Sequence, residues 1–153
     1  MTSGLIDVEL VDLDLDASVT DKDGAIRRLV GLARDAGRVQ DVEQLLADVR
    51  ARERQLPTGL EGGIGIPHAR STAVSQQTVA FGRSTCGIDF GAADGPAHII
   101  FLLAAPDGAA GEHLTLLAAL ARRLVHASFR ELLLSATDPQ EIVDAFRTQV
   151  QRQ

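Results

Sequence analysis

The chain contains the run Ile99-Ile100-Phe101-Leu102-Leu103-Ala104-Ala105, in which every residue is apolar. A strand that is covered on both faces has this pattern, because neither face needs polar side chains. Pro106 follows the run and should end the strand, since proline has no N–H to give to a strand ladder. The run is far shorter than the roughly 18–20 apolar residues that a membrane-spanning helix requires. It therefore predicts a central, fully covered strand and no insertion into a membrane.

Helical patterns lie on both sides of this strand in the sequence. Their apolar periodicity predicts five helices, which begin near Thr20, Asp41, Glu112, Ser128 and Asp138, and capping residues mark each of these starts except that at Glu112. Further strands are expected over 11–16, where apolar residues alternate with aspartate, and over 79–82. Strands with helices before and after them predict an α/β fold, specifically a three-layer α/β/α sandwich with a central mixed sheet flanked by helices on both sides.

The composition is that of one ordinary globular domain. The chain has 153 residues, of which 45% are hydrophobic and 24% charged, and domains of about 100–150 residues are typical. We expect a single domain over residues 1–153, with its core over roughly 5–150. The net charge of −6 argues against a nucleic-acid partner, which favours a basic face. The first residues lack the basic flank and apolar segment of a signal peptide, so a cytoplasmic location is expected.

The cysteine and histidine counts argue against a metal site. The single cysteine, Cys86, excludes an internal disulfide and a cysteine-rich zinc site, and we expect it to be a small buried apolar residue. The histidines include no third ligand at a diagnostic spacing, so no metal is predicted. His98 and His126 are interpreted as structural.

The stretch from Leu56 to His68 is rich in glycine and proline and interrupts the helical periodicity. We expect an irregular loop or short bent strands here. Pro67 fixes its own φ and keeps the preceding residue extended, so His68 follows a stiff segment that can present its imidazole at the surface. At an ordinary pKa of about 6.5 the ring is mostly neutral at pH 7, and neutral imidazole is a nucleophile. The alternative is a turn histidine whose nitrogens bond to the backbone.

His113 and Arg52 are the candidate partners of such a nucleophile. His113 lies on the buried stripe of a predicted helix but in its exposed first turn, where backbone N–H groups and a partial positive charge favour an anion. Its ring could donate to a phosphate oxygen or orient His68. The guanidinium of Arg52 could bind phosphate oxygens, with Arg54 and Arg70 as competing candidates. The structural alternatives are a polar residue near a helix cap and a cation that favours the helix dipole.

The segment from Arg52 to Arg70 closely resembles the active-site region of enzyme IIA domains of the fructose–mannitol type, from the bacterial sugar phosphotransferase system (PTS). The family pattern reads here Arg52-Glu53, Thr58-Gly59 and Gly63-Ile64-Gly65-Ile66-Pro67-His68. A second family signature, a histidine that opens a leucine-rich helix, reads here Gly111-Glu112-His113-Leu114 and onwards. The resemblance covers roughly residues 5–150. Two positions depart from the family: Gly65 stands where alanine is more frequent, and Gly62 where asparagine is common.

The resemblance implies a phosphocarrier and phosphotransferase with a phosphohistidine intermediate and no cofactor. His68 would take a phosphoryl group from the phosphohistidine of the small carrier HPr. It would pass the group to an enzyme IIB domain, on a cysteine in this class, for uptake and phosphorylation of a fructose- or mannitol-type sugar. The dianion on His68 needs cationic or N–H partners, which we assign to Arg52 and His113, with Thr58 as a hydroxyl donor.

The alternative is the nitrogen-regulatory branch of the same family, whose members bind target proteins according to their phosphorylation state. The motifs named above do not separate the two branches. Either function needs an exposed surface around His68 for transient protein partners. Leu56, Leu60, Ile64 and Ile66 flank the site in the sequence, and we expect some of them to form this surface.

Overall fold

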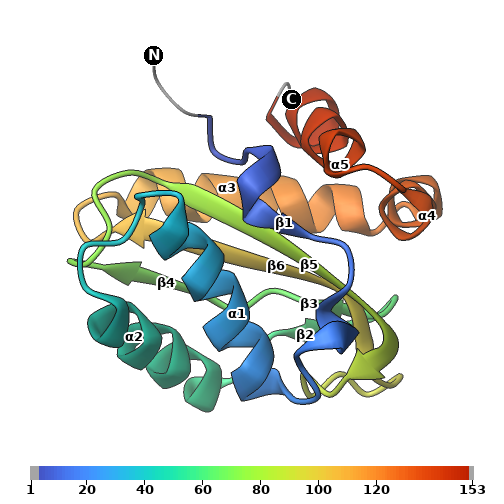
Figure 1. Cartoon of the computed structure of the whole chain (residues 1–153), viewed down its shortest axis with the longest axis horizontal. Helices are drawn as coiled ribbons and strands as arrows, with labels where there is room; N and C mark the ends of the chain where they lie inside the picture. Colours follow the sequence, from blue (N-terminus) through green and yellow to red (C-terminus); the bar gives the residue numbers. More distant parts are fainter. Residues whose placement is uncertain (1–3, 152–153) are drawn as a thin grey trace.

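The computed structural model describes residues 4–151, and within them six strands form one mixed sheet (Figure 1). The strands are β1 (Val11–Asp12), β2 (Gly59–Leu60), β3 (Ile64–Gly65), β4 (His68–Ser71), β5 (Thr78–Ile88) and β6 (Ala97–Pro106). Their order is β1-β5-β6-β3-β2, and β4 also pairs with β6. β3 and β4 run parallel to β6, whereas β5 runs antiparallel to it. The longest two strands therefore form the centre of the sheet.

Helices cover both faces of this sheet. They are α1 (Lys22–Asp35), α2 (Val42–Gln55), α3 (Ala110–Leu124), α4 (Ala127–Ser135) and α5 (Pro139–Phe146), followed by a π-helical turn, η3 (Arg147–Gln151). Figure 1 shows α1 and α2 on one face and α3 on the other, with α4 beside α3 and α5 near β1. This arrangement confirms the predicted α/β sandwich with a central mixed sheet.

The apolar run of β6 lies at the centre of the core, as predicted. Each residue over 99–105 is at most 2% exposed. The ring of Phe101 lies 5.1 Å from that of Phe81 on β5 and 6.0 Å from that of Phe146 on α5, measured between centroids. The aromatic contacts therefore join the central strands to the last helix, and the buried apolar surface is the main stabilising contribution to the fold.

The N-terminal strand is much shorter than the alternating pattern over 11–16 predicted. β1 ends at Asp12, and a 3₁₀ turn, η2 (Leu15–Ala17), follows. The carboxylate of Asp12 accepts a hydrogen bond from the backbone N–H two residues later (2.8 Å). The carboxylate of Asp16 accepts bonds from two backbone N–H groups and one hydroxyl of β5. Aspartates that bond to backbone groups compete with the strand ladder, so the alternation does not yield a longer strand.

Two of the predicted helix caps are wrong. Asp21 caps α1 in place of Thr20, because its carboxylate accepts a backbone N–H of the first turn (2.7 Å). α4 begins one residue before Ser128, which therefore lies inside the first turn and is not the N-cap. The caps at Asp41 and Asp138 are confirmed, and the second of these forms a capping box.

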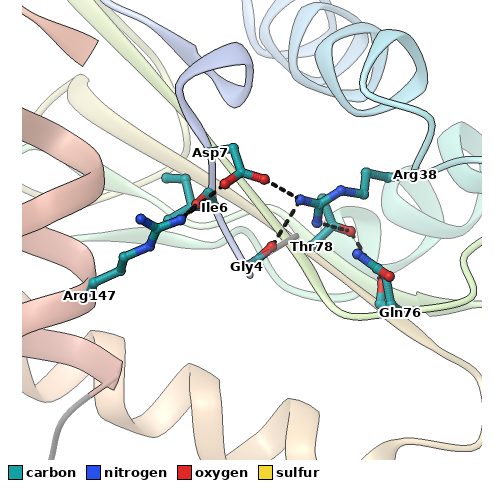
Figure 2. A network of polar contacts seen from close by, with 7 residues as sticks. All are labelled: Gly4, Ile6, Asp7, Arg38, Gln76, Thr78 and Arg147. Carbon is teal, nitrogen blue, oxygen red and sulfur yellow. Dashed lines mark hydrogen bonds and ion pairs between the residues drawn. The ribbon is translucent and has the colours of Figure 1, made fainter. Parts of the chain in front are cut away.

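Three charged residues, Asp7, Arg38 and Arg147, form a cluster that we call the terminal clamp (Figure 2). Arg38 is 4% exposed and donates to the carbonyl oxygen of Gly4 (2.9 Å), the carboxylate of Asp7 (2.7 Å) and the hydroxyl of Thr78 (3.3 Å). Arg147 donates to the other carboxylate oxygen of Asp7 (3.0 Å) and to a neighbouring backbone carbonyl (3.1 Å). The clamp therefore ties the segment before β1 to the α1–α2 connection and to η3.

The exposure of Cys86 and the length and polarity of the helices bear on two further expectations. Cys86 is exposed, so the expectation of a buried apolar cysteine is wrong. It lies where β5 changes register, and its backbone N–H donates to Asp16 (3.0 Å). Over residues 4–151, each helix is too short or too polar to cross a membrane.

Candidate active site

His68 lies at the start of β4, where the strand beside β6 is interrupted. β3 and β4 both pair with β6, and Ile66-Pro67 separate them. Pro67 has no N–H for the ladder, but its carbonyl oxygen accepts a hydrogen bond from the N–H of Leu103 on β6 (3.1 Å). The segment before His68 therefore contains two short strands, β2 and β3, of which β3 pairs with the central strand; this is the second of the two alternatives that the sequence predicts.

Two glycines allow this segment to approach the chain after β5 closely. A Cβ on Gly65 would lie 2.7 Å from the ring of Phe90, and a Cβ on Gly59 would lie 2.6 Å from the carbonyl oxygen of Phe90. That oxygen already accepts the N–H of Gly59 (3.0 Å). Phe90 is fully buried, so a larger residue at either position would have to displace it. Gly65, one of the two positions at which the sequence departs from the resembled pattern, is thus matched to Phe90.

The ring of His68 is half-buried, and one of its nitrogens bonds to the backbone. Nδ1 lies 2.9 Å from the carbonyl oxygen of Ile66. A carbonyl oxygen can only accept, so we assign the proton of the neutral ring to Nδ1 and the lone pair to Nε2. Nε2 has no hydrogen-bond partner within residues 4–151. The bond from Nδ1 is of the kind that the alternative of a turn histidine bonded to the backbone also predicts, and it leaves the lone pair of Nε2 for chemistry.

His113, from the first turn of α3, lies beside His68. The ring centroids are 5.4 Å apart, and the ring planes are inclined by 51°. The side chain of His113 is only 7% exposed, so the expectation that this turn is exposed is wrong at this residue. Both of its ring nitrogens lack a hydrogen-bond partner in the described part of the chain. Buried polar groups are ordinarily paired, so the N–H of His113 is available to a ligand that enters beside His68.

The surroundings of both histidines favour the neutral ring. Burial lowers the pKa of His68, and the positive charge of Arg52 lowers it further, whereas a backbone hydrogen bond and the negative charge of Glu53 raise it. Burial, with the charges of His68 and Arg70, lowers the pKa of His113 to about 4. At pH 7 His68 is therefore in its nucleophilic form, and His113 can donate one N–H.

Arg52 and Arg70 bring positive charge to the two histidines from different elements. Arg52 lies in the last turn of α2, and its guanidinium donates to a backbone carbonyl oxygen (2.9 Å). Arg70 lies two residues after His68 on β4, on the same face of the strand, and also donates to a carbonyl oxygen (2.9 Å). A guanidinium has five N–H groups, so each arginine retains donors for an anion. Arg54 is exposed and lines a separate cavity between α1 and α2.

The hydroxyl of Thr58 is already bonded. Thr58 is 8% exposed, and its hydroxyl donates to one carboxylate oxygen of Glu53 (2.7 Å), while its backbone N–H donates to the other (2.8 Å). A direct bond from this hydroxyl to a phosphate would require the bond to Glu53 to break. The role of Thr58 as a hydroxyl donor to phosphate therefore stays a prediction, and the contact present in the structure is with Glu53.

Glu53 is the residue of this region to which the sequence assigned no role. It is only 5% exposed. It follows Leu46 by seven residues and Val49 by four, so it lies on the buried stripe of α2, where a glutamate is unusual. That spacing was a signal for a paired, buried carboxylate. Its counter-ion is Lys22 of α1, with Nζ 3.3 Å from the carboxylate.

The apolar residues that flank the site divide into two groups. Leu56 is 65% exposed and Leu60 is 41% exposed, and Leu114, next to His113 in the sequence, is 69% exposed. Ile64 and Ile66 are buried in the core, so they are not available to a partner. The exposed leucines leave apolar surface for a protein partner to cover.

The two remaining histidines have other surroundings. Nδ1 of His98 lies 2.9 Å from the carbonyl oxygen of Ser84. His126 is exposed at the N-cap of α4, and its side chain makes no capping bond. Across the described residues, no three His, Cys, Asp or Glu side chains are grouped as metal ligands.

On this α/β sandwich the half-buried imidazole of His68 lies beside the buried ring of His113. Together with the family match this gives the class of protein: a phosphotransferase component that uses a phosphohistidine intermediate. The family model described as "Phosphoenolpyruvate-dependent sugar phosphotransferase system, EIIA 2" matches residues 5–149. The chain therefore belongs to the type 2 enzyme IIA family of the PTS, which confirms the resemblance inferred from the motifs.

Three relatives illustrate the family. The chain is 44% identical over 143 residues to the PTS system fructose-specific EIIA component of Haloferax volcanii, covering 93% of this chain and 92% of that protein. It is 35% identical over 133 residues to the PTS system fructose-specific EIIABC component of Bacillus subtilis, covering 86% of this chain but only 21% of that longer protein. The crystal structure of nitrogen regulatory protein IIA-Ntr from Neisseria meningitidis matches with a TM-score of 0.83 and 31% identity, over 92% of this chain and 95% of that one.

Proposed function

We propose that this protein carries a phosphoryl group on Nε2 of His68, taking it from phospho-HPr and passing it to an enzyme IIB domain for sugar uptake of the fructose or mannitol type. The observation that carries the proposal is the buried ring of His113, 5.4 Å from His68, with both nitrogens unpartnered within residues 4–151. Such a group is stabilised when an acceptor arrives beside His68, and a phosphoryl oxygen is such an acceptor. The relay would operate in the cytoplasm.

In the first step, the Nε2 lone pair of His68 bonds to the phosphorus of the donor phosphohistidine. The donor P–N bond breaks, and its electron pair returns to the donor ring. Nδ1 of His68 keeps its proton, so the phosphorylated ring carries positive charge, which the carbonyl oxygen of Ile66 stabilises. His113 donates its N–H to a phosphoryl oxygen, and Arg52 offsets the negative charge. Phosphoryl transfer depends mainly on such positioning and charge stabilisation.

In the second step, a cysteine thiolate of the IIB domain attacks the same phosphorus. The bond between phosphorus and Nε2 of His68 breaks, and the electron pair returns to Nε2, which restores the neutral ring. The positive charge on the phosphorylated ring makes it a good leaving group, as a relay requires. The fructose-specific EIIABC relative, whose name joins the A, B and C components, supports a IIB domain as the acceptor.

The test is phosphorylation by enzyme I, HPr and phosphoenolpyruvate, followed by intact-mass measurement. We expect one added phosphoryl group that is lost in acid and survives base. His68→Ala should accept none, because the nucleophile is gone, whereas His126→Ala should accept it at the wild-type rate. Labelling of His68→Ala at the wild-type rate would overturn the proposal.

A regulatory function is the second candidate, because the matched IIA-Ntr structure covers nearly all of this chain at 31% identity. In that case phosphorylation of His68 would control binding to a target protein. Transfer of the phosphoryl group from this chain to a fructose-type IIB domain would favour the sugar-transport proposal. Absence of such transfer, with retained acceptance from HPr, would favour the regulatory one.

The docking surface can be tested at Leu60, which is 41% exposed and lies on β2. Leu60→Asp should slow transfer from HPr by about 10-fold, because a charge replaces an apolar contact that a partner would cover. The unfolding free energy should change little, since the side chain is not in the core. Glu61→Gln, at the next residue and also exposed, is the matched control. Unchanged transfer kinetics in Leu60→Asp would remove this residue from the docking surface.

A further inference from the structure

We propose that Glu53, held by Lys22, is a positioning residue for His68: it fixes the start of the histidine-bearing segment at Thr58 and places one negative charge near the accepting ring. This inference rests on the proposed function, since it concerns the same histidine. No part of it requires Glu53 to touch the phosphoryl group.

The contacts of Glu53 are more extensive than an ordinary surface carboxylate makes. Both oxygens accept from Thr58, through its N–H (2.8 Å) and its hydroxyl (2.7 Å). Nζ of Lys22 donates to the same oxygen as the N–H (3.3 Å). Glu53 is 5% exposed, and a buried carboxylate with three donors is held in one orientation. Glu53 therefore joins the end of α2 to the first residue of the glycine-rich segment.

The segment that begins at Thr58 is then fixed at successive points up to His68. The carbonyl oxygen of Thr58 accepts the N–H of Ile66 (3.3 Å), and the carbonyl oxygen of Ile66 accepts from Nδ1 of His68 (2.9 Å). Three hydrogen-bonded steps thus lead from the carboxylate of Glu53 to the accepting ring. A displacement of Thr58 is transmitted to the group that sets the orientation of this ring.

Lys22 is joined to the same segment a second time. It is the only lysine of the 153 residues, and its Nζ lies over the ring of Phe90, 5.9 Å from the centroid. Phe90 is the residue against which Gly59 and Gly65 pack. Lys22 therefore contacts both groups that fix the segment, the carboxylate of Glu53 and the ring of Phe90.

The charge of Glu53 has a consequence separate from its contacts. The charged and titratable groups that act on the two histidines are Arg52 and Glu53 from α2, Arg70 from β4, and the two rings themselves. Of these, Glu53 carries the negative charge. It raises the pKa of His68 against the effects of burial and Arg52. A negative charge also disfavours a dianion on that ring, which helps the phosphoryl group to leave.

Glu53→Gln tests both effects at once, because glutamine keeps the size of the side chain but loses its charge and one acceptor oxygen. It can accept from only one of the two donors of Thr58. We expect transfer from HPr to slow by about 10- to 100-fold through misplacement of His68. We also expect the pKa of His68, measured by NMR titration, to fall. Glu43→Gln, an exposed glutamate on the same helix, should change neither quantity.

Lys22→Met should shift the pKa of His68 in the direction opposite to that expected for Glu53→Gln. Removal of the lysine leaves the charge of Glu53 unneutralised, so the pKa of His68 should rise. Thr58→Val removes one hydrogen bond and no charge. It should therefore slow transfer, and its shift in the pKa of His68 should be smaller than that of Glu53→Gln or Lys22→Met. A purely structural role for these residues gives no reason for the pKa of His68 to move in opposite directions in Glu53→Gln and Lys22→Met.

The titration of His68 needs no phosphoryl donor, so it can be read even if the proposed function is wrong. If Glu53→Gln folds and leaves both the pKa of His68 and the transfer rate unchanged, this inference fails while the phosphocarrier proposal stands. If Glu53→Gln does not fold, the inference is tested by Lys22→Met, in which the pKa of His68 is expected to rise. A fall or no change of the pKa in Lys22→Met would overturn the inference.

Discussion

The terminal clamp and the histidine site differ in how completely their buried polar groups are paired. Arg38 of the clamp is 4% exposed and donates to three acceptors. His113 is 7% exposed, and neither of its ring nitrogens has a partner in the described chain. A paired buried group stabilises the fold, whereas an unpaired one costs stability unless a ligand supplies its partner. We therefore expect the terminal clamp to stabilise the fold and the two histidines to bind and transfer a ligand.

The largest stability effect should come from the clamp. Arg38→Met leaves the carboxylate of Asp7 with one partner fewer in a part-buried place, so unfolding should require about 3 kcal/mol less free energy. Urea denaturation measures this loss. Transfer from HPr should remain at the wild-type rate, because the clamp does not touch the histidines. Arg34→Met, which breaks an exposed ion pair on α1, should cost no more than about 0.5 kcal/mol. Lost transfer in a folded Arg38→Met protein would remove the distinction.

The complementary variant is His113→Leu, which should leave stability unchanged or raised. No hydrogen bond within residues 4–151 is lost, and an unpaired buried group is replaced by an apolar one. Transfer should slow by about 10- to 150-fold, since one charge-assisted hydrogen bond to the phosphoryl group is gone. Rapid-quench kinetics and urea denaturation of the same preparation measure the two effects. A variant that is destabilised and still transfers normally would reverse the assignment.

The pH dependence of stability sharpens the comparison further. The pKa of His113 falls from an ordinary 6.5 to about 4 in the folded protein, mainly through burial. Between pH 4 and pH 6.5 the unfolded chain binds more protons at His113 than the folded protein does. The unfolding free energy that neutral His113 preserves is therefore fully present above pH 6.5 and is lost as the pH falls towards 4. The unfolding free energy of the wild type should therefore decline more steeply over this window than that of His113→Leu. Parallel curves would contradict the lowered pKa.

Arg52→Ala should have the smallest effect. Its guanidinium is half-exposed and already bonded to a carbonyl oxygen, and solvent weakens the attraction between exposed charges. We expect transfer to slow by roughly 10-fold or less, with the loss shrinking as salt is added. Because Arg52 lowers the pKa of His68, that pKa should rise in the variant. Arg54→Ala, two residues further along α2 and exposed, is the control, and an equal loss there would show that the effect is general.

The predictability of the fold follows the strength of the local signals. The central strand was predicted because an apolar run with a closing proline has few other interpretations. β5 was expected over 79–82 but extends to Ile88. Its second half, from Arg83, is polar and changes register, so it carries no alternating pattern. The alternation over 11–16 was misleading, because aspartates there bond to backbone groups elsewhere.

In the site, the sequence motifs identify the two histidines but do not predict their burial or the contacts around them. His68 could be singled out from a glycine- and proline-rich segment, and the family resemblance paired it with His113. The depth of His113 could not be predicted, because a first turn is exposed unless tertiary packing covers it. The role of Glu53 depends on Thr58 and Lys22 approaching from two other elements, which no local pattern reports.

The most direct test of the account is ring ¹⁵N and ³¹P NMR of the phosphorylated protein. In the proposed relay the phosphoryl group is on Nε2 of His68, with Nδ1 still protonated and bonded to the carbonyl oxygen of Ile66. The spectra should then show a phosphorus coupling to Nε2 and a retained proton on Nδ1. A phosphoryl group on Nδ1, or on any other histidine, would contradict the account.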